Sequence, residues 1–159
     1  MTPRVNYIQQ SPDLFKKLME FSKLIDNGAI TEKIRNLVSI RASQLNGCAF
    51  CLDMHVKQAK LHGEHDLRVH HLATWQESNL FLPKERAALV WTDVLTKLPE
   101  HGVTDDVYNQ VRTQLSEKEI SDLTFTVMAI NAWNRANVAF KTVPGSADVS
   151  YGLGKAYTN

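Results

Sequence analysis

Two cysteines and a histidine form the most reactive cluster in this sequence. Cys48 and Cys51 are its only cysteines, and His55 follows four residues after the second of them. At about 100° per residue, an α-helix places these three side chains within an arc of roughly 60°. The spacing therefore predicts one face of a helix that carries two thiols and an imidazole near its start.

A helix start of this kind can turn a thiol into a nucleophile. Its unpaired backbone N–H groups and its dipole stabilise an anion, and an imidazole one turn later can take the thiol proton. Lowering a thiol pKa from about 8.5 to about 6.5 converts a few per cent of thiolate at pH 7 into a majority. We predict Cys51, in the firmer first turn and nearer His55, as the attacking thiol. Cys48, at the loose cap after Gly47, is predicted as the resolving thiol.

Disulfide closure needs Cβ atoms about 3.8 Å apart, closer than the roughly 5 to 6 Å of a regular i,i+3 helical pair. Cys48 at the cap supplies that freedom. Two other interpretations stay open: a zinc site with Cys48, Cys51 and His55 as three ligands, although no fourth ligand stands nearby, or a pair of buried inert thiols. A thioredoxin fold is disfavoured because no strand precedes the motif. Redox chemistry is the favoured hypothesis.

Helices are predicted to position this motif. Apolar residues recur every three to four positions between Gly and Pro breaks, and no alternating strand pattern of useful length occurs. The seven predicted helices lie at about 12–25, 31–45, 48–62, 64–76, 83–98, from 104 onward, and 116–140. We predict an all-α, compact antiparallel domain of about six to seven helices with a helix-loop-helix Cys-x-x-Cys core.

The length of 159 residues fits a single domain over residues 1–159, with a core at about 12–140 and a C-terminal tail at 141–159. The end of the tail, from residue 144, has no periodicity and is expected to fray or to lie on a neighbouring subunit.

Charge and hydropathy exclude several classes of partner. The 18 Lys and Arg residues balance the 17 Asp and Glu residues, and like charges do not cluster, so neither nucleic acid nor a membrane is expected as a partner. No apolar run approaches a membrane span, and the first residues lack a signal-peptide pattern. A soluble, cytoplasmic protein is therefore expected. No phosphate-binding loop or nucleotide fingerprint is present, so no cofactor is expected.

The cysteine motif and the residues before it resemble the signature of a known family. Residues 37–55, LVSIRASQLNGCAFCLDMH, resemble the signature of the alkylhydroperoxidase D-like branch of the carboxymuconolactone decarboxylase family. Further matching segments lie at 75–78, 85–89 and 130–135. The resemblance covers about residues 12 to 140.

The resemblance implies an all-helical thiol peroxidase, an antioxidant enzyme that needs neither a metal nor an organic cofactor. Its second cysteine attacks a hydroperoxide, becomes a sulfenic acid and closes a disulfide with the first, and a dithiol protein or small molecule restores the pair. By motif position these roles fall on Cys51 and Cys48, with His55 in the proton relay. The resemblance also implies a homo-oligomer, as a trimer or a hexamer.

Two positions depart from the family pattern. Asn36 stands where the relay glutamate is usual, twelve residues before the first cysteine, and Phe50 replaces a histidine between the cysteines. An amide cannot pass on a proton at neutral pH, so a weaker peroxidase activity is expected. Glu32 or Glu85 could replace the carboxylate, or either could be a solvated first-turn acid that complements a helix dipole. Arg41 is expected to form a structural ion pair.

Two alternative functions use the same residues differently. A decarboxylase acting on an aromatic-derived lactone would not depend on a cysteine pair, so the intact pair argues against it. A non-catalytic redox-sensing or zinc-binding module would use the thiols to change its assembly.

Overall fold

The computed structural model describes residues 2–157, and within them every regular element is a helix and no strand occurs. The all-α prediction is confirmed. The α-helices are α1 (Tyr7–Gln10), α2 (Pro12–Asp26), α3 (Glu32–Asn46), α4 (Ala49–Leu61), α5 (Asp66–His71), α6 (Pro83–Lys97), α7 (Asp105–Arg112), α8 (Glu117–Phe140) and α9 (Asp148–Tyr151). The 3₁₀ helices are η1 (Leu72–Glu77) and η2 (Leu153–Tyr157).

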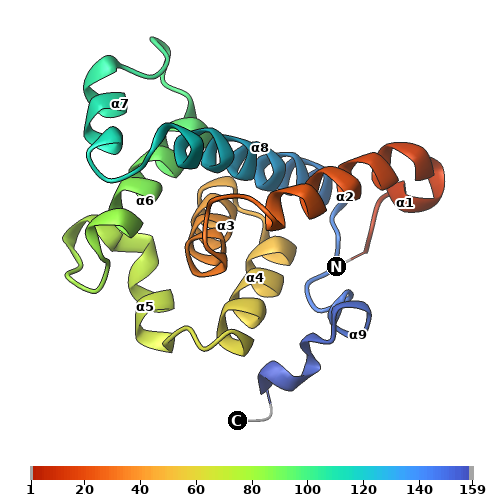
Figure 1. Ribbon diagram of the computed structural model, residues 1–159. Coiled ribbons are helices and arrows are strands. Elements are labelled where there is room, and N and C mark those ends of the chain that lie inside the picture. The colour runs from red at the N-terminus through yellow and green to blue at the C-terminus, as the bar shows by residue number, and fades with distance from the viewer. Residues whose placement is uncertain (1, 158–159) are drawn as a thin grey trace.

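Helix α3 lies at the centre of the fold, against α4, α6 and α8 (Figure 1). Thr31 caps its first turn by accepting the N–H of Ile34. Its apolar residues are spread around the helix, which is the pattern of an element covered on several sides. They are at most 6% exposed: Ile34, Leu37, Val38, Ile40 and Ala42. This central position holds the α3–α4 hairpin, and with it the cysteine motif, in a fixed frame.

The structure contains more helical segments than the predicted six to seven. The predicted helix at 64–76 is two elements, α5 and η1, and η1 contains non-helical backbone angles at Thr74. Helices α1, α9 and η2 were not predicted. Their four or five residues are too few for a 3.6-residue period to emerge, so packing decides their conformation.

The described part of the tail packs on its own chain rather than fraying. The buried Lys57 ammonium on α4 pairs with Asp53 at 2.6 Å and with Asp148 of α9 at 2.8 Å. Asp53 also accepts the Gly145 backbone N–H at 2.9 Å. The expectation that residues 144–157 fray was therefore wrong, because sequence periodicity does not reveal a buried ion pair across 91 residues. That the tail lies on a neighbouring subunit stays a prediction. Residues 158 and 159 lie outside the described residues.

None of the helices within residues 2–157 combines the length and the apolar character that crossing a bilayer requires.

Candidate active site

The cysteine motif begins at a sharp turn between α3 and α4. Gly47 ends α3 with φ +65°, a left-handed conformation that glycine adopts without a Cβ clash. Cys48 follows as the extended N-cap of α4, and its own N–H returns to the Ser43 carbonyl at 3.0 Å. The predicted cap position of Cys48 is confirmed.

The two cysteines are joined by a disulfide, with Cα atoms 5.4 Å apart. Cys48 is 2% exposed and Cys51 is 1% exposed, and both pack against Ala42, Ile130 and the partly buried Phe50. The pair can therefore form and hold a disulfide inside this fold.

Each sulfur has its own hydrogen-bond donor. The Cys51 backbone N–H, one of the unpaired donors of the α4 start, donates to Cys48 Sγ at 3.3 Å. The Asn137 side-chain amide on α8 donates to Cys51 Sγ at 3.6 Å. From the sequence, the N–H groups of the helix start were expected to stabilise a Cys51 thiolate. In the structure one of these groups donates to Cys48, and Asn137, which was not predicted, donates to Cys51.

Asn137 belongs to a series of buried amides on α8, spaced three residues apart with Asn131 and Asn134. Asn134 donates to Ser43 Oγ at 3.1 Å and accepts from Asn46 at 2.9 Å, which ties α8 to the end of α3. Three asparagines spaced three residues apart along one helix were the sequence signal for this site. The sequence-based prediction did not include them.

His55 lies one turn beyond Cys51 on α4 and is partly buried. Its Nδ1 donates to Gln58 Oε1 at 2.7 Å, which leaves Nε2 as the acceptor nitrogen of the neutral ring. Burial lowers the pKa of His55 to about 4, against the smaller opposing effect of the Gln58 hydrogen bond. Within residues 2–157 no hydrogen bond joins His55 to either sulfur. His55 is therefore neutral at pH 7.

Asn36 lies at the opposite end of the α3–α4 hairpin from the cysteines. His62 Nδ1 is 3.1 Å from Asn36 Nδ2 and 3.3 Å from Glu32 Oε1. His62 follows Cys51 by eleven residues, which is about 16 Å along a helix at 1.5 Å per residue. A cleft of about 170 Å³ opens here, lined by Glu32, Asn36 and His62 among others. The structure thus separates Asn36 and Glu32 from the disulfide.

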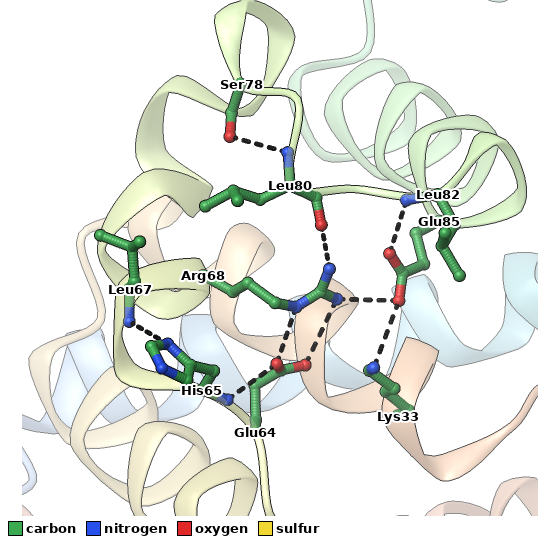
Figure 2. A network of polar contacts seen from close by, with 9 residues as sticks. All are labelled: Lys33, Glu64, His65, Leu67, Arg68, Ser78, Leu80, Leu82 and Glu85. Carbon is green, nitrogen blue, oxygen red and sulfur yellow. Dashed lines mark hydrogen bonds and ion pairs between the residues drawn. The ribbon is translucent and has the colours of Figure 1, made fainter.

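Glu85 is held in a structural network, which Figure 2 shows. Its side chain accepts the Leu82 backbone N–H at 2.8 Å and the Arg68 guanidinium at 2.8 Å, and Lys33 lies 4.0 Å away. Arg68 also pairs with Glu64 at 2.8 Å. Glu85 is a first-turn acid as expected, but it is 3% exposed rather than solvated.

Arg41 forms the structural ion pair that we expected. Its guanidinium donates twice to the Asp93 carboxylate, at 2.6 and 2.9 Å, and once to the Ala73 carbonyl at 3.0 Å. These bonds join α3 to α6 and η1.

The described part of the chain holds no group of three or more His, Cys, Asp or Glu side chains placed to bind a metal ion. Cys48, Cys51 and His55 therefore do not come together as a three-ligand set in this structure.

The chain is similar to known proteins in sequence and in fold. Residues 12–93 match the family model of the carboxymuconolactone decarboxylase family. The uncharacterised protein YdfG of Bacillus subtilis is 37% identical over 139 residues, which cover 87% of this chain and 95% of YdfG.

Two solved structures share the fold. A protein of unknown function from Agrobacterium tumefaciens, proposed to be an antioxidant defence protein AhpD, has a TM-score of 0.87 at 36% identity. The match covers 90% of this chain and 98% of that protein. A peroxidase-related protein with an alkylhydroperoxidase AhpD core from Ralstonia eutropha has a TM-score of 0.77 at 17% identity, with 87% and 74% of the two chains covered. The second likeness concerns the fold alone.

Proposed function

The chain belongs to the carboxymuconolactone decarboxylase family, and we propose that it is a thiol-dependent peroxidase that reduces hydroperoxides through Cys48 and Cys51. The observation that carries this proposal is the disulfide between them at the start of α4. A pair that closes inside the fold, with a donor on each sulfur, can alternate between dithiol and disulfide while the helices keep their places.

The proposed cycle has three steps. The Cys51 thiolate attacks the distal oxygen of a hydroperoxide, the O–O bond breaks, and an alcohol leaves after taking a proton while Cys51 becomes a sulfenic acid. The Cys48 thiolate then attacks the Cys51 sulfur, so that the S–S bond forms, the S–O bond breaks, and the hydroxyl takes up a proton and leaves as water. A dithiol reductant finally attacks the disulfide by thiol exchange and is itself oxidised, which returns both cysteines to thiols.

The hydrogen bonds suit these roles. Cys48 Sγ accepts a backbone N–H at the helix start, which stabilises the thiolate that must attack the sulfenic acid. His55 is proposed as the proton carrier for Cys51, with its neutral Nε2 as the acceptor. Its pKa of about 4 makes it a weak base, so it carries the proton only transiently.

The burial of the sulfurs limits what can reach them. At 1% and 2% exposure, neither cysteine is open to a bulky reactant. Reaction with a hydroperoxide or a dithiol therefore requires a neighbouring side chain, such as the partly buried Phe50, to move. This requirement favours small hydroperoxides and a reductant that can insert an extended thiol. It is also a reason to expect slow turnover.

A homo-oligomer, a trimer or a hexamer, is part of the proposal. Leu14 and Leu24 of α2 are 74% and 73% exposed, and Met128 of the adjacent α8 is 53% exposed. Exposed apolar side chains on two neighbouring helices are more stable when another copy covers them. Light scattering on the purified protein should give a mass above that of one chain, and Leu24→Lys should lower it.

A peroxide-consumption assay with a generic dithiol tests the function. Cys51→Ser should lower turnover by about 10³-fold or more, because it removes the nucleophile. Cys48→Ser serves as the matched control, since it keeps the attacking thiol and should yield one equivalent of sulfenic acid without a disulfide.

Full turnover in Cys51→Ser would contradict the assignment of the nucleophile. Stoichiometric oxidation of the wild-type pair without turnover would instead indicate a redox sensor.

A further inference from the structure

The orientation of the Asn137 amide is set by the backbone of its own helix. Its Nδ2 lies 2.9 Å from the Trp133 carbonyl oxygen, one turn earlier on α8, and only an N–H can face an acceptor there. One hydrogen of the NH₂ group is thus used, and the second is directed to Cys51 Sγ at 3.6 Å. Asn137 is 4% exposed, so water does not compete for these bonds.

Tyr7 holds the other end of the same amide. Its hydroxyl donates to Asn137 Oδ1 at 3.2 Å, and its ring stacks on Phe140 with ring centres 5.3 Å apart. Arg4 fixes the approach of this segment, since its backbone N–H donates to the Phe140 carbonyl at 2.9 Å. Burial raises the pKa of Tyr7, with a smaller contribution from Tyr151, so the hydroxyl keeps its proton. The N-terminal segment thus brings a donor to the far side of the amide.

From these contacts we propose that Asn137 is the hydrogen-bond donor that stabilises the Cys51 thiolate, and that Tyr7 is the positioning residue that holds its amide. A carboxamide N–H is polarised further when its own oxygen accepts a hydrogen bond, so the Tyr7 contact strengthens the donor that faces sulfur. The donor matters more to the thiolate than to the disulfide, because a hydrogen bond to an ionised acceptor is about twice as strong as one to a neutral acceptor.

The surroundings of Cys51 make this donor important. Asp53 and Lys57 on α4 pair with each other and with Asp148, and His55 is bonded to Gln58. Among residues 2–157, Asn137 is the one side chain that donates a hydrogen bond to Cys51 Sγ. An uncharged hydrogen bond from α8 therefore favours the anion at this sulfur.

The inference rests on the proposed use of Cys51 as a thiolate, but titration tests it without any peroxidase turnover. In a Cys48→Ser background Cys51 is the only thiol, and its ionisation can be followed by ultraviolet thiolate absorbance. Asn137→Leu should raise the thiol pKa by about one unit, and Tyr7→Phe should raise it by about 0.3 units. Asn131→Leu is the matched control, because Asn131 also donates to the carbonyl four residues earlier but bonds no sulfur.

The wild-type protein provides a second measurement if Asn137→Leu fails to fold. The side-chain amide resonance of Asn137 should move as Cys51 titrates, and the resonance of Asn131 should stay in place. A thiol pKa that is the same in Asn137→Leu, Asn131→Leu and the parent would overturn the inference. An amide resonance of Asn137 that ignores the thiol titration would also overturn it. If the wild-type protein shows no peroxidase activity while Asn137→Leu still raises the pKa of Cys51 as expected, the result would count against the proposed function alone.

Discussion

The two ends of the α3–α4 hairpin differ in solvent access and in the kind of polar group they hold. At the cysteine end, Cys51 is 1% exposed and Asn134 is fully buried, and the polar contacts between α3, α4 and α8 there come from amides, hydroxyls and backbone. At the other end, the side chains of Glu32 and His62 are 58% and 42% exposed beside an open cleft.

This contrast separates two ways of assisting a thiol. A buried uncharged donor acts at short range and at every pH, because it does not titrate and water does not compete with it. Exposed acids and imidazoles exchange protons readily, but solvent screens them, and here they lie about 16 Å along α4 from Cys51. Thiol chemistry at the buried end must therefore depend on fixed hydrogen bonds more than on the titrating groups of the open end.

The largest effect on stability is expected when an asparagine is replaced by leucine at one end of the hairpin or, in a separate variant, at the other. Asn134→Leu should lower the free energy of unfolding by about 3 kcal/mol, because Ser43 and Asn46 each lose a buried hydrogen-bond partner. Asn36→Leu should cost about 1 kcal/mol, since its partner His62 is exposed and water can replace the amide. Denaturant unfolding of the oxidised proteins measures both.

Equal losses at the two positions, or a larger loss at Asn36, would mean that the hairpin ends do not differ in the way described.

Local patterns predicted the larger helices and the cysteine pair well. Thr31, Gly47 and Ser116 mark helix boundaries through their own backbone and capping preferences, so neighbouring residues suffice to place α3, α4 and α8. The position of Cys48 at the cap followed from the same reasoning.

The donors at the site required contacts that span the sequence. Asn137 meets Cys51 across 86 residues and Tyr7 across 130 residues, and no local pattern relates such positions. Asn36, at the position where the family usually has its relay glutamate, shows the converse difficulty. Asn36 precedes Cys48 by only twelve residues in sequence but lies far from it in space, because α3 runs away from the turn at Gly47 and Asn36 is near its distant end.

A smaller effect is expected from acid titration of His55. Its pKa is lowered to about 4 in the folded protein, so between about pH 6.5 and 4 the unfolded chain binds a proton that the folded chain does not. The contribution of the neutral His55 ring to the free energy of unfolding is fully present above pH 6.5 and is lost as the pH falls toward 4. For this partly buried group it is on the order of 2 kcal/mol. His55→Gln should remove this part of the slope.

Unfolding free energies at several pH values test this expectation, with His62→Gln as the control for loss of an exposed imidazole at the other end of α4. An unchanged slope in His55→Gln would assign the acid sensitivity to other groups.

The smallest effect is expected when the missing family carboxylate is restored. General acid–base assistance is worth about 10² to 10⁴ in rate only where the group reaches the reacting proton directly or through one water. A glutamate at position 36 would lie level with His62 and beside Glu32, far from Cys51 along α4, so Asn36→Glu should change peroxide turnover by less than about threefold. Asn36→Gln is the matched control, because it adds the same methylene without the charge. A gain of tenfold or more in Asn36→Glu alone, with the melting temperature unchanged, would show that protons reach Cys51 from the open end, and the contrast between the two ends would then not extend to catalysis.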